Sequence, residues 1–387
     1  MVTGGSGLSA QTIPNDRVRR SKRRPRLLLT AHVWLGLFAA AFVTIMSLSG
    51  CIIVFRHNLE YRSAPRIAAA PGRVRPVDAA VLANRIKLFR PDGTMTRIVF
   101  PEAADEPLLV ELLAKPGQRL QIYCDPFTGA VIGARKQTAW LDWIVSLHHN
   151  LLLGKLGRAM TGVIGIALLL LSLSGLINWL FGPRNWSTAL ALPYPGPLRR
   201  MAYPLHRSAG LWMNGILIVI SVTGIGLAYA EMVKQLADSI GGGTARVRKA
   251  DRSSSAFKGE ERAALPLEQY VSAAQGALPE GSIRELRMPE RGGNAVTALF
   301  SMPGDLRSKG SSSVTLDPAS AKVIATESFP SMQPSEKLFY VVTLIHFVEW
   351  GGWPVKIVWC LFGLSPAVLT ATGIAIWWIW RRAPVNR

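Results

Sequence analysis

Cysteines and charged residues are scarce in this sequence, and each shortage excludes a class of protein. Three cysteines, Cys51, Cys124 and Cys360, are too few for the disulfide framework of a small secreted domain. The 24 acidic residues are outnumbered by 44 lysines and arginines, which gives a formal net charge of +20. Only 18% of the residues are charged and 49% are hydrophobic, so the chain is too apolar for an ordinary soluble protein of 387 residues.

The apolar residues are concentrated in four blocks. These blocks run approximately over Leu27–Phe55, Met160–Phe181, Leu211–Tyr229 and Val355–Trp380. About 20 helical residues cross the hydrocarbon core of a bilayer, so we expect four transmembrane helices. The apolar core of the first block is too long for a cleaved signal peptide, and we expect it to remain as a membrane helix.

Basic residues near the ends of these blocks predict the orientation. They cluster around Arg20, Arg200 and Arg381, in the N-terminal tail, the short connection between the second and third blocks, and the C-terminus. Lysine and arginine accumulate on the cytoplasmic side, so we expect a multi-pass protein of the bacterial inner membrane with both termini in the cytoplasm. The positive charge then largely reflects membrane topology, and no nucleic-acid partner is expected.

The expected fold class is a membrane protein with four transmembrane helices in a duplicated arrangement and two periplasmic α+β domains. The predicted segments are a basic tail (1–26), a helix (27–57), a periplasmic domain (58–147), a helix (148–181), a cytoplasmic loop (182–205), a helix (206–229), a second periplasmic domain (230–345), a helix (346–381) and a short tail (382–387). Alternating apolar residues around an Asp-Pro turn predict a β-hairpin in each outer domain, over residues 120–132 and 313–324. The second hairpin lacks the turn glycine of the first, Gly129.

Four histidines stand at matched distances from four glycines in the two halves of the chain. The spacing is 18 residues in one set and 27 in the other: His32 to Gly50 and His206 to Gly224, then His148 to Gly175 and His346 to Gly373 (50 − 32 = 224 − 206 = 18; 175 − 148 = 373 − 346 = 27). Histidine is the commonest metal-ligating side chain and is costly inside a bilayer. The repeated spacing therefore predicts two pairs of metal ligands.

A hydroxyl residue directly precedes each of these glycines. The four dipeptides are Ser49-Gly50, Ser174-Gly175, Thr223-Gly224 and Thr372-Gly373. Small residues also let helices pack closely in membranes, which is the alternative explanation. We expect a further role, in which the glycine leaves room for a flat macrocycle and the hydroxyl group bonds back to the helix.

The histidine precedes the glycine in all four predicted helices, but neighbouring helices cross the membrane in opposite directions, which predicts one ligand pair near each membrane face. His32 and His206 would form the cytoplasmic pair, and His148 and His346 the periplasmic pair. The adjacent His149 is an alternative to His148. His57 is expected to have only a structural role.

Haem fits these pairs better than zinc does. Zinc usually takes four protein ligands, and no Cys, Asp or Glu is placed to complete either pair. Two axial imidazoles on an iron porphyrin need no further protein ligand. No Cys-x-x-Cys-His motif for covalent attachment occurs, so we expect two non-covalent, b-type haems and no separate catalytic residue.

The sequence around the histidines resembles a known family. The four segments are Ala31–Gly36, Leu147–Gly154, Leu205–Trp212 and Ile345–Gly352, and they are similar to the histidine motifs of PepSY-associated transmembrane proteins. Within that family the chain most resembles the inner-membrane siderophore reductases that act on ferrioxamine. The resemblance implies a di-haem enzyme that reduces ferric siderophores, with hydroxamate chelates favoured, in the periplasm.

The electron donor and the alternatives follow from what the sequence lacks. No flavin or nicotinamide fingerprint occurs, and Gly241-Gly242-Gly243 has the wrong spacing for a nucleotide loop. We therefore expect a separate donor, either a cytoplasmic protein, a diffusible reductant or a membrane quinol. One alternative function is a haem-free transporter or sensor whose histidines relay protons. Another is a quinol-linked b-type cytochrome without specificity for chelates.

Overall fold

The computed structural model describes most of the chain. The described residues are 16–62, 65, 67, 77–102, 105–115, 118–136, 139–181, 196–240, 265–289, 295–307 and 310–382. The first 15 residues of the basic tail, most of the predicted cytoplasmic loop, the glycine triplet at 241–243 and residues 383–387 lie outside them. The chain forms two compact units. The first comprises Met1–Ser47, Ile164–Ser221 and Leu364–Arg387, and the second comprises Leu48–Val163 and Val222–Gly363.

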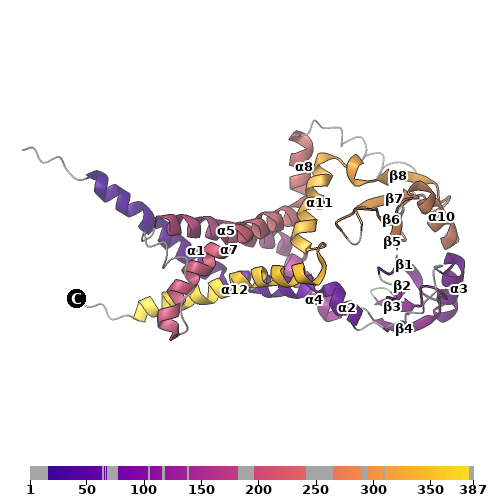
Figure 1. The fold of residues 1–387 in the computed structure, drawn as a ribbon, viewed down its shortest axis with the longest axis horizontal. Helices are drawn as coiled ribbons and strands as arrows, with labels where there is room; N and C mark the ends of the chain where they lie inside the picture. The colour runs from indigo at the N-terminus through magenta and orange to yellow at the C-terminus, as the bar shows by residue number, and fades with distance from the viewer. Residues whose placement is uncertain are drawn as a thin grey trace, which may run out of the picture. The chain divides into compact units, whose positions relative to one another are not determined.

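Four long helices in the described residues are apolar enough to cross a membrane (Figure 1). They are α1 (Asp16–Val54), α5 (Gly154–Leu180), α7 (Leu198–Ala228) and α12 (Gly352–Arg382). The mean hydropathy of their most apolar windows lies between 1.8 and 2.3, and at most a third of each window is buried by protein. Such exposed apolar surface fits a hydrocarbon solvent and not water.

The second and fourth long helices begin later than the sequence predicted. A shorter helix, α4 (Ala139–Asn150), ends just before Leu151 and Leu152, which both have positive φ. Another, α11 (Pro334–Phe347), ends at Val348, which is also left-handed. A left-handed residue ends a right-handed helix, so the predicted helices over 148–181 and 346–381 are each two helices. His148 and His346 therefore lie on the short helices α4 and α11.

The other two predicted helices also differ at their ends. Helix α7 begins at Leu198, eight residues before the predicted start at 206 (206 − 198), and contains Pro204. Helix α1 ends at Val54, and a turn at Phe55 separates it from α2 (Arg56–Arg62). Helix α8 (Ala230–Ile240) follows α7 and packs against α11.

In the second unit the two outer segments share one antiparallel sheet, so they are not two separate domains. The strands are β1 (Thr94–Val99), β2 (Leu108–Lys115), β3 (Gln118–Cys124), β4 (Val131–Lys136), β5 (Ser282–Arg287), β6 (Val296–Ser301), β7 (Ser312–Leu316) and β8 (Val323–Glu327). Their order is β4-β3-β2-β1-β5-β6-β7-β8. The pairing of β1 with β5, with Ile98 opposite Leu286, joins the four strands of one segment to the four of the other.

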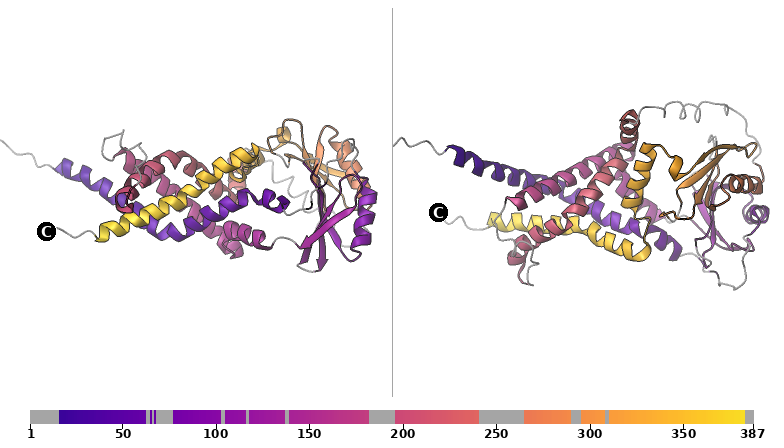
Figure 2. Two further views of the ribbon diagram at one scale, coloured as in Figure 1. Left: turned by 60° about the horizontal axis from the view of Figure 1, so that its bottom comes forward. Right: turned by 45° about the horizontal axis from the view of Figure 1, so that its top comes forward.

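The core of the second unit lies on one face of this sheet, under α3 (Ala79–Phe89) and α10 (Leu267–Ala277) (Figure 2). Strand residues alternate between buried and partly buried, because successive side chains point to opposite faces. Ile98, Val110 and Leu286 are fully buried on the helix side. The other face of the sheet is consequently left for polar residues.

Both predicted hairpins are present, as β3–β4 and β7–β8. In each turn the aspartate carboxylate accepts a hydrogen bond from the backbone N–H two residues later: Phe127 donates to Asp125 and Ala319 donates to Asp317, both at 2.8 Å. The turn glycine of the first hairpin, Gly129, has φ +67°. Ala321 occupies the equivalent place in the second with φ 52°, a strained conformation for a residue with a Cβ.

Candidate functional site

Each of the four predicted histidines contacts a Ser/Thr-Gly dipeptide on another helix. The hydroxyl oxygen lies within hydrogen-bonding distance of Nδ1 in every case: His32 and Ser174 at 2.8 Å, His206 and Thr372 at 3.0 Å, His148 and Ser49 at 3.0 Å, His346 and Thr223 at 2.8 Å. The same contact thus occurs four times, twice in each compact unit.

The glycine of each dipeptide lies under the Cε1 edge of the same histidine ring. A Cβ added to the glycine would lie 2.9 Å from Cε1 at Gly50, 3.3 Å at Gly175, 3.3 Å at Gly224 and 3.4 Å at Gly373. Carbon atoms are in comfortable contact at about 3.5 to 4.0 Å, so a side chain at Gly50 would displace the ring. We had expected these glycines to make room for a macrocycle. The space that they provide is occupied by the histidine.

In each half of the chain the contacts are reciprocal: the histidine of each segment contacts the Ser/Thr-Gly dipeptide of the other. His32 on α1 uses the dipeptide of α5, and His148 on α4 uses the dipeptide of α1. In the second half, His206 on α7 uses α12, and His346 on α11 uses α7. The equal spacing survives the helix breaks because each following long helix begins six residues after the histidine (154 − 148 = 352 − 346 = 6).

The structure brings His32 and His206 together in the first unit. Their ring centroids are 6.3 Å apart and the ring planes are nearly perpendicular, at 84°. Two imidazoles that bind one metal atom from opposite sides, with bonds of about 2 Å, have centroids about 6 Å apart. The observed separation fits two imidazoles on one metal atom.

In the second unit the Ser/Thr-Gly contacts are made by His148 and His346. His149 is the sequence neighbour of His148, with ring centroids 6.1 Å apart, and lies near enough to His346 for their charges to interact. The contact between His148 and Ser49-Gly50 matches the other three, so it favours His148 as the ligand. His149 stays the alternative. His57 is exposed on α2.

A family comparison agrees with the motifs. The family model of the PepSY-associated TM region matches residues 29–379, which include all of α5 and α7, most of α1 and α12, and all four histidines. The chain belongs to the family of PepSY-associated transmembrane proteins. It is accordingly a multi-pass membrane protein. No curated protein matches the sequence.

The part of the chain that the structure describes contains no group of three or more His, Cys, Asp or Glu side chains placed to hold a metal ion. Among the described residues, the candidate metal ligands are therefore the histidine pairs.

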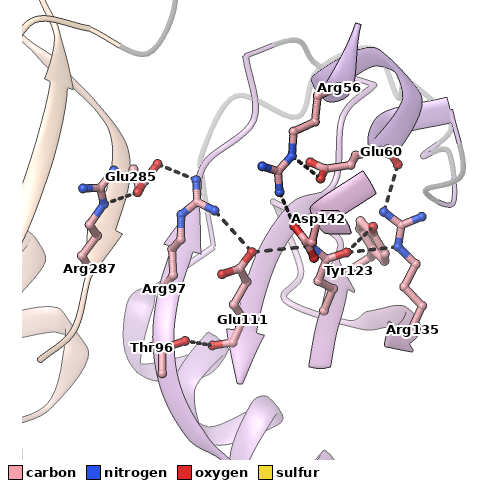
Figure 3. A network of polar contacts seen from close by, with 11 residues as sticks. Arg56, Glu60, Thr96, Arg97, Glu111, Tyr123, Arg135, Asp142, Glu285 and Arg287 are labelled. Carbon is pink, nitrogen blue, oxygen red and sulfur yellow. Dashed lines mark hydrogen bonds and ion pairs between the residues drawn. The ribbon is translucent and has the colours of Figure 1, made fainter. Parts of the chain in front are cut away.

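A network of ion pairs covers the sheet face opposite α3 and α10, and the sequence patterns did not reveal it (Figure 3). Arg97 on β1 bonds Glu285 of the other outer segment at 2.8 Å and Glu111 of its own at 3.3 Å. Both carboxylates are almost completely buried. Burial works to raise the pKa of Glu285, but the hydrogen bonds and charges of Arg97 and Arg287 outweigh it and hold that pKa below its ordinary value. The alternation of charged and core residues along β2 and β5 was the available signal.

The same network reaches the ends of the membrane helices within the second unit. Arg56 on α2 bonds Asp142 on α4 at 2.8 Å. Arg135 on β4 donates to the carbonyl of Glu60 on α2 at 3.2 Å. Nearer to His346, Arg307 pairs with Glu349 in the break between α11 and α12. The segments that carry His148 and His346 are therefore held by ion pairs as well as by the Ser/Thr-Gly contacts.

Proposed function

We propose that this PepSY-associated protein is a di-haem reductase of the bacterial inner membrane that passes electrons to ferric siderophore chelates in the periplasm. The observation that carries the proposal is the fourfold Ser/Thr-Gly contact, together with the 6.3 Å separation of His32 and His206. The hydroxyl group engages Nδ1 and leaves Nε2 as the nitrogen that can bind iron. This donor set fits a b-type haem.

Haem, when bound by two imidazoles, supplies reversible transfer of one electron at a time. His32 and His206 would hold one haem near the cytoplasmic face, and His148 and His346 a second near the periplasmic face. Ser and Thr hydroxyl groups orient the rings, and the glycines allow the rings to approach the helix backbone. Apolar helices around the sites exclude water and other reactants.

A ferric chelate is the substrate that the family resemblance suggests. Hard oxygen ligands such as hydroxamates bind Fe(III) far better than Fe(II), so one-electron reduction releases the metal. The donor is a separate cytoplasmic protein, a diffusible reductant or a membrane quinol. In this topology both termini are cytoplasmic and the sheet of the second unit is periplasmic.

The first test is the haem content of the purified full-length chain. A pyridine haemochrome assay should find two non-covalent haems per chain, with a low-spin spectrum. His32→Ala and His206→Ala should each lose the same haem, and the double variant should match either single variant. His149→Ala is the matched control for His148→Ala; loss of a haem only with His149→Ala would move the ligand by one residue. A haem-free protein, expressed with adequate haem, would favour proton relay instead.

The second test is electron transfer to a chelate. Dithionite-reduced protein should be reoxidised by a ferric hydroxamate, and Fe(II) should appear in a ferrous trap. His346→Ala should abolish this transfer, whereas His32→Ala should spare it when the reductant reaches the outer haem directly. Oxidation of a quinol without any reaction with ferric hydroxamate or catecholate chelates would identify a quinol-linked cytochrome.

A further inference from the structure

The hydroxyl group of Ser174 already donates its only hydrogen within its own helix. Its Oγ donates to the carbonyl of Leu171 at 3.2 Å while it lies 2.8 Å from Nδ1 of His32. A hydroxyl group has one hydrogen and two lone pairs, so Oγ can only accept from the histidine. This geometry favours the tautomer of His32 that carries its hydrogen on Nδ1.

Thr372 repeats this arrangement for His206. Its Oγ1 lies 2.9 Å from the carbonyl of Val368 and 3.1 Å from that of Leu369, and 3.0 Å from Nδ1 of His206. The hydroxyl hydrogen is again directed at the backbone, which leaves the oxygen as an acceptor. The two histidines that face each other at 6.3 Å are thus both Nδ1–H donors.

We infer that Ser174 and Thr372 are positioning residues that fix the tautomer of His32 and His206, direct Nε2 to the iron and lower the reduction potential of the haem bound there. The part that concerns haem rests on the proposed function. A neutral imidazole with hydrogen on Nδ1 has its lone pair on Nε2. Donation from Nδ1–H to an acceptor makes the ring a stronger ligand, which favours Fe(III) over Fe(II) and so lowers the potential.

The midpoint potentials of both haems, measured by spectroelectrochemical titration, test this inference. Ser174→Ala and Thr372→Val remove the hydroxyl acceptor and leave the backbone carbonyls of Leu171 and Leu369 beside the rings. These variants should shift the inner haem to a more positive potential, with the outer haem unchanged. Ser174→Thr and Thr372→Ser keep a hydroxyl group, so each of these variants should retain the wild-type midpoint potential. Ser172→Ala is the matched control, because Ser172 is a buried hydroxyl residue on the same helix that donates to the carbonyl of Leu168 at 2.9 Å.

A second readout needs no haem. In ¹⁵N-histidine-labelled, haem-free full-length protein, solid-state NMR should show His32 and His206 protonated at Nδ1, and Ser174→Ala should give His32 a mixture of tautomers. Protonated Nε2 in the wild type would overturn the inference, as would potentials unchanged by both Ser174→Ala and Thr372→Val. A chain that binds no haem would refute the proposed function while leaving the tautomer result to be judged on its own.

Discussion

Adding one methyl group at Gly50 should weaken the outer haem site. The new Cβ of Gly50→Ala would lie 2.9 Å from Cε1 of His148, about 0.6 Å closer than carbon atoms pack without strain. If the ring moves away by that amount, the 3.0 Å distance between Ser49 Oγ and His148 Nδ1 grows to at most about 3.6 Å, where the hydrogen bond is lost. Loss of such a contact behind a metal ligand typically costs about 10- to 100-fold in affinity.

Helix propensity acts in the opposite direction and must be separated from this effect. Alanine is about 1 kcal/mol better than glycine inside a helix, so Gly50→Ala also gains some helix stability. Gly215→Ala on α7 is the matched control, because no heavy atom lies within 4 Å of the added Cβ. Gly373→Ala gives an intermediate test: its Cβ would lie 3.4 Å from His206 Cε1, which is close to ordinary contact.

Haem transfer to apomyoglobin measures these affinities, with the His206→Ala background isolating the outer haem. We expect Gly50→Ala to release the outer haem at least about 10-fold more readily than Gly215→Ala does. The corresponding inner-haem measurement, in a His346→Ala background, should show a much smaller effect of Gly373→Ala. Equal haem retention by Gly50→Ala and Gly215→Ala would refute the argument that Gly50 makes room for His148.

Three further predictions concern the second unit. Because the pKa of Glu285 is lowered in the folded state, its ion pair with Arg97 stabilises the fold at pH values above the ordinary glutamate pKa of about 4.3. This stabilisation is lost as the pH falls through the folded-state pKa. The variant Glu285→Gln should therefore lose less thermal stability than the wild type between pH 7 and pH 3. Ala321→Gly should raise the free energy of unfolding by about 0.5 to 1 kcal/mol in denaturant titrations, because it relieves a left-handed alanine, and Gly129→Ala should lower it. Burial, together with the charge of Asp125, raises the pKa of Cys124 to about 12, so mass spectrometry should find this thiol unalkylated at pH 8 until denaturant is added.

The pairing of histidines with Ser/Thr-Gly dipeptides could be anticipated from the sequence, but not the helices that carry the histidines. Matched spacing identified His148 and His346 and the glycines of the motif. The residues that end α4 and α11 are left-handed without being glycine or asparagine, so they carry no signal themselves. The glycines with positive φ at the same breaks, Gly154, Gly351 and Gly352, were the available signal, and the matched spacing did not use it. The spacing was consequently interpreted as lying along one helix, whereas it extends over two.

The sheet shows the same division between local and long-range structure. The two hairpins were predictable because an Asp-Pro turn and alternating apolar residues specify them within about a dozen residues. The pairing of β1 with β5 depends on contacts such as Ile98 with Leu286, which are distant in sequence. Arg97 and Glu285 form an ion pair across this junction. No motif in either strand indicates its partner, since pairing between distant strands is decided by the fold as a whole.

Two kinds of matched glycine separate helix packing from a role at the histidines. Gly36 and Gly210 stand four residues after His32 and His206 (36 − 32 = 210 − 206), and their added Cβ atoms would meet leucine side chains at an ordinary 3.7 Å. These two glycines fit the packing explanation, which requires a small residue where two helices touch. That explanation does not require any particular residue type beside the glycine or opposite it. The glycines of the four Ser/Thr-Gly dipeptides meet the Cε1 atom of a histidine every time, beside a hydroxyl group bonded to the same ring. Packing alone gives no reason for that coincidence, whereas the proposed binding of iron through Nε2, with the imidazole held at its Nδ1 edge, would use both residues.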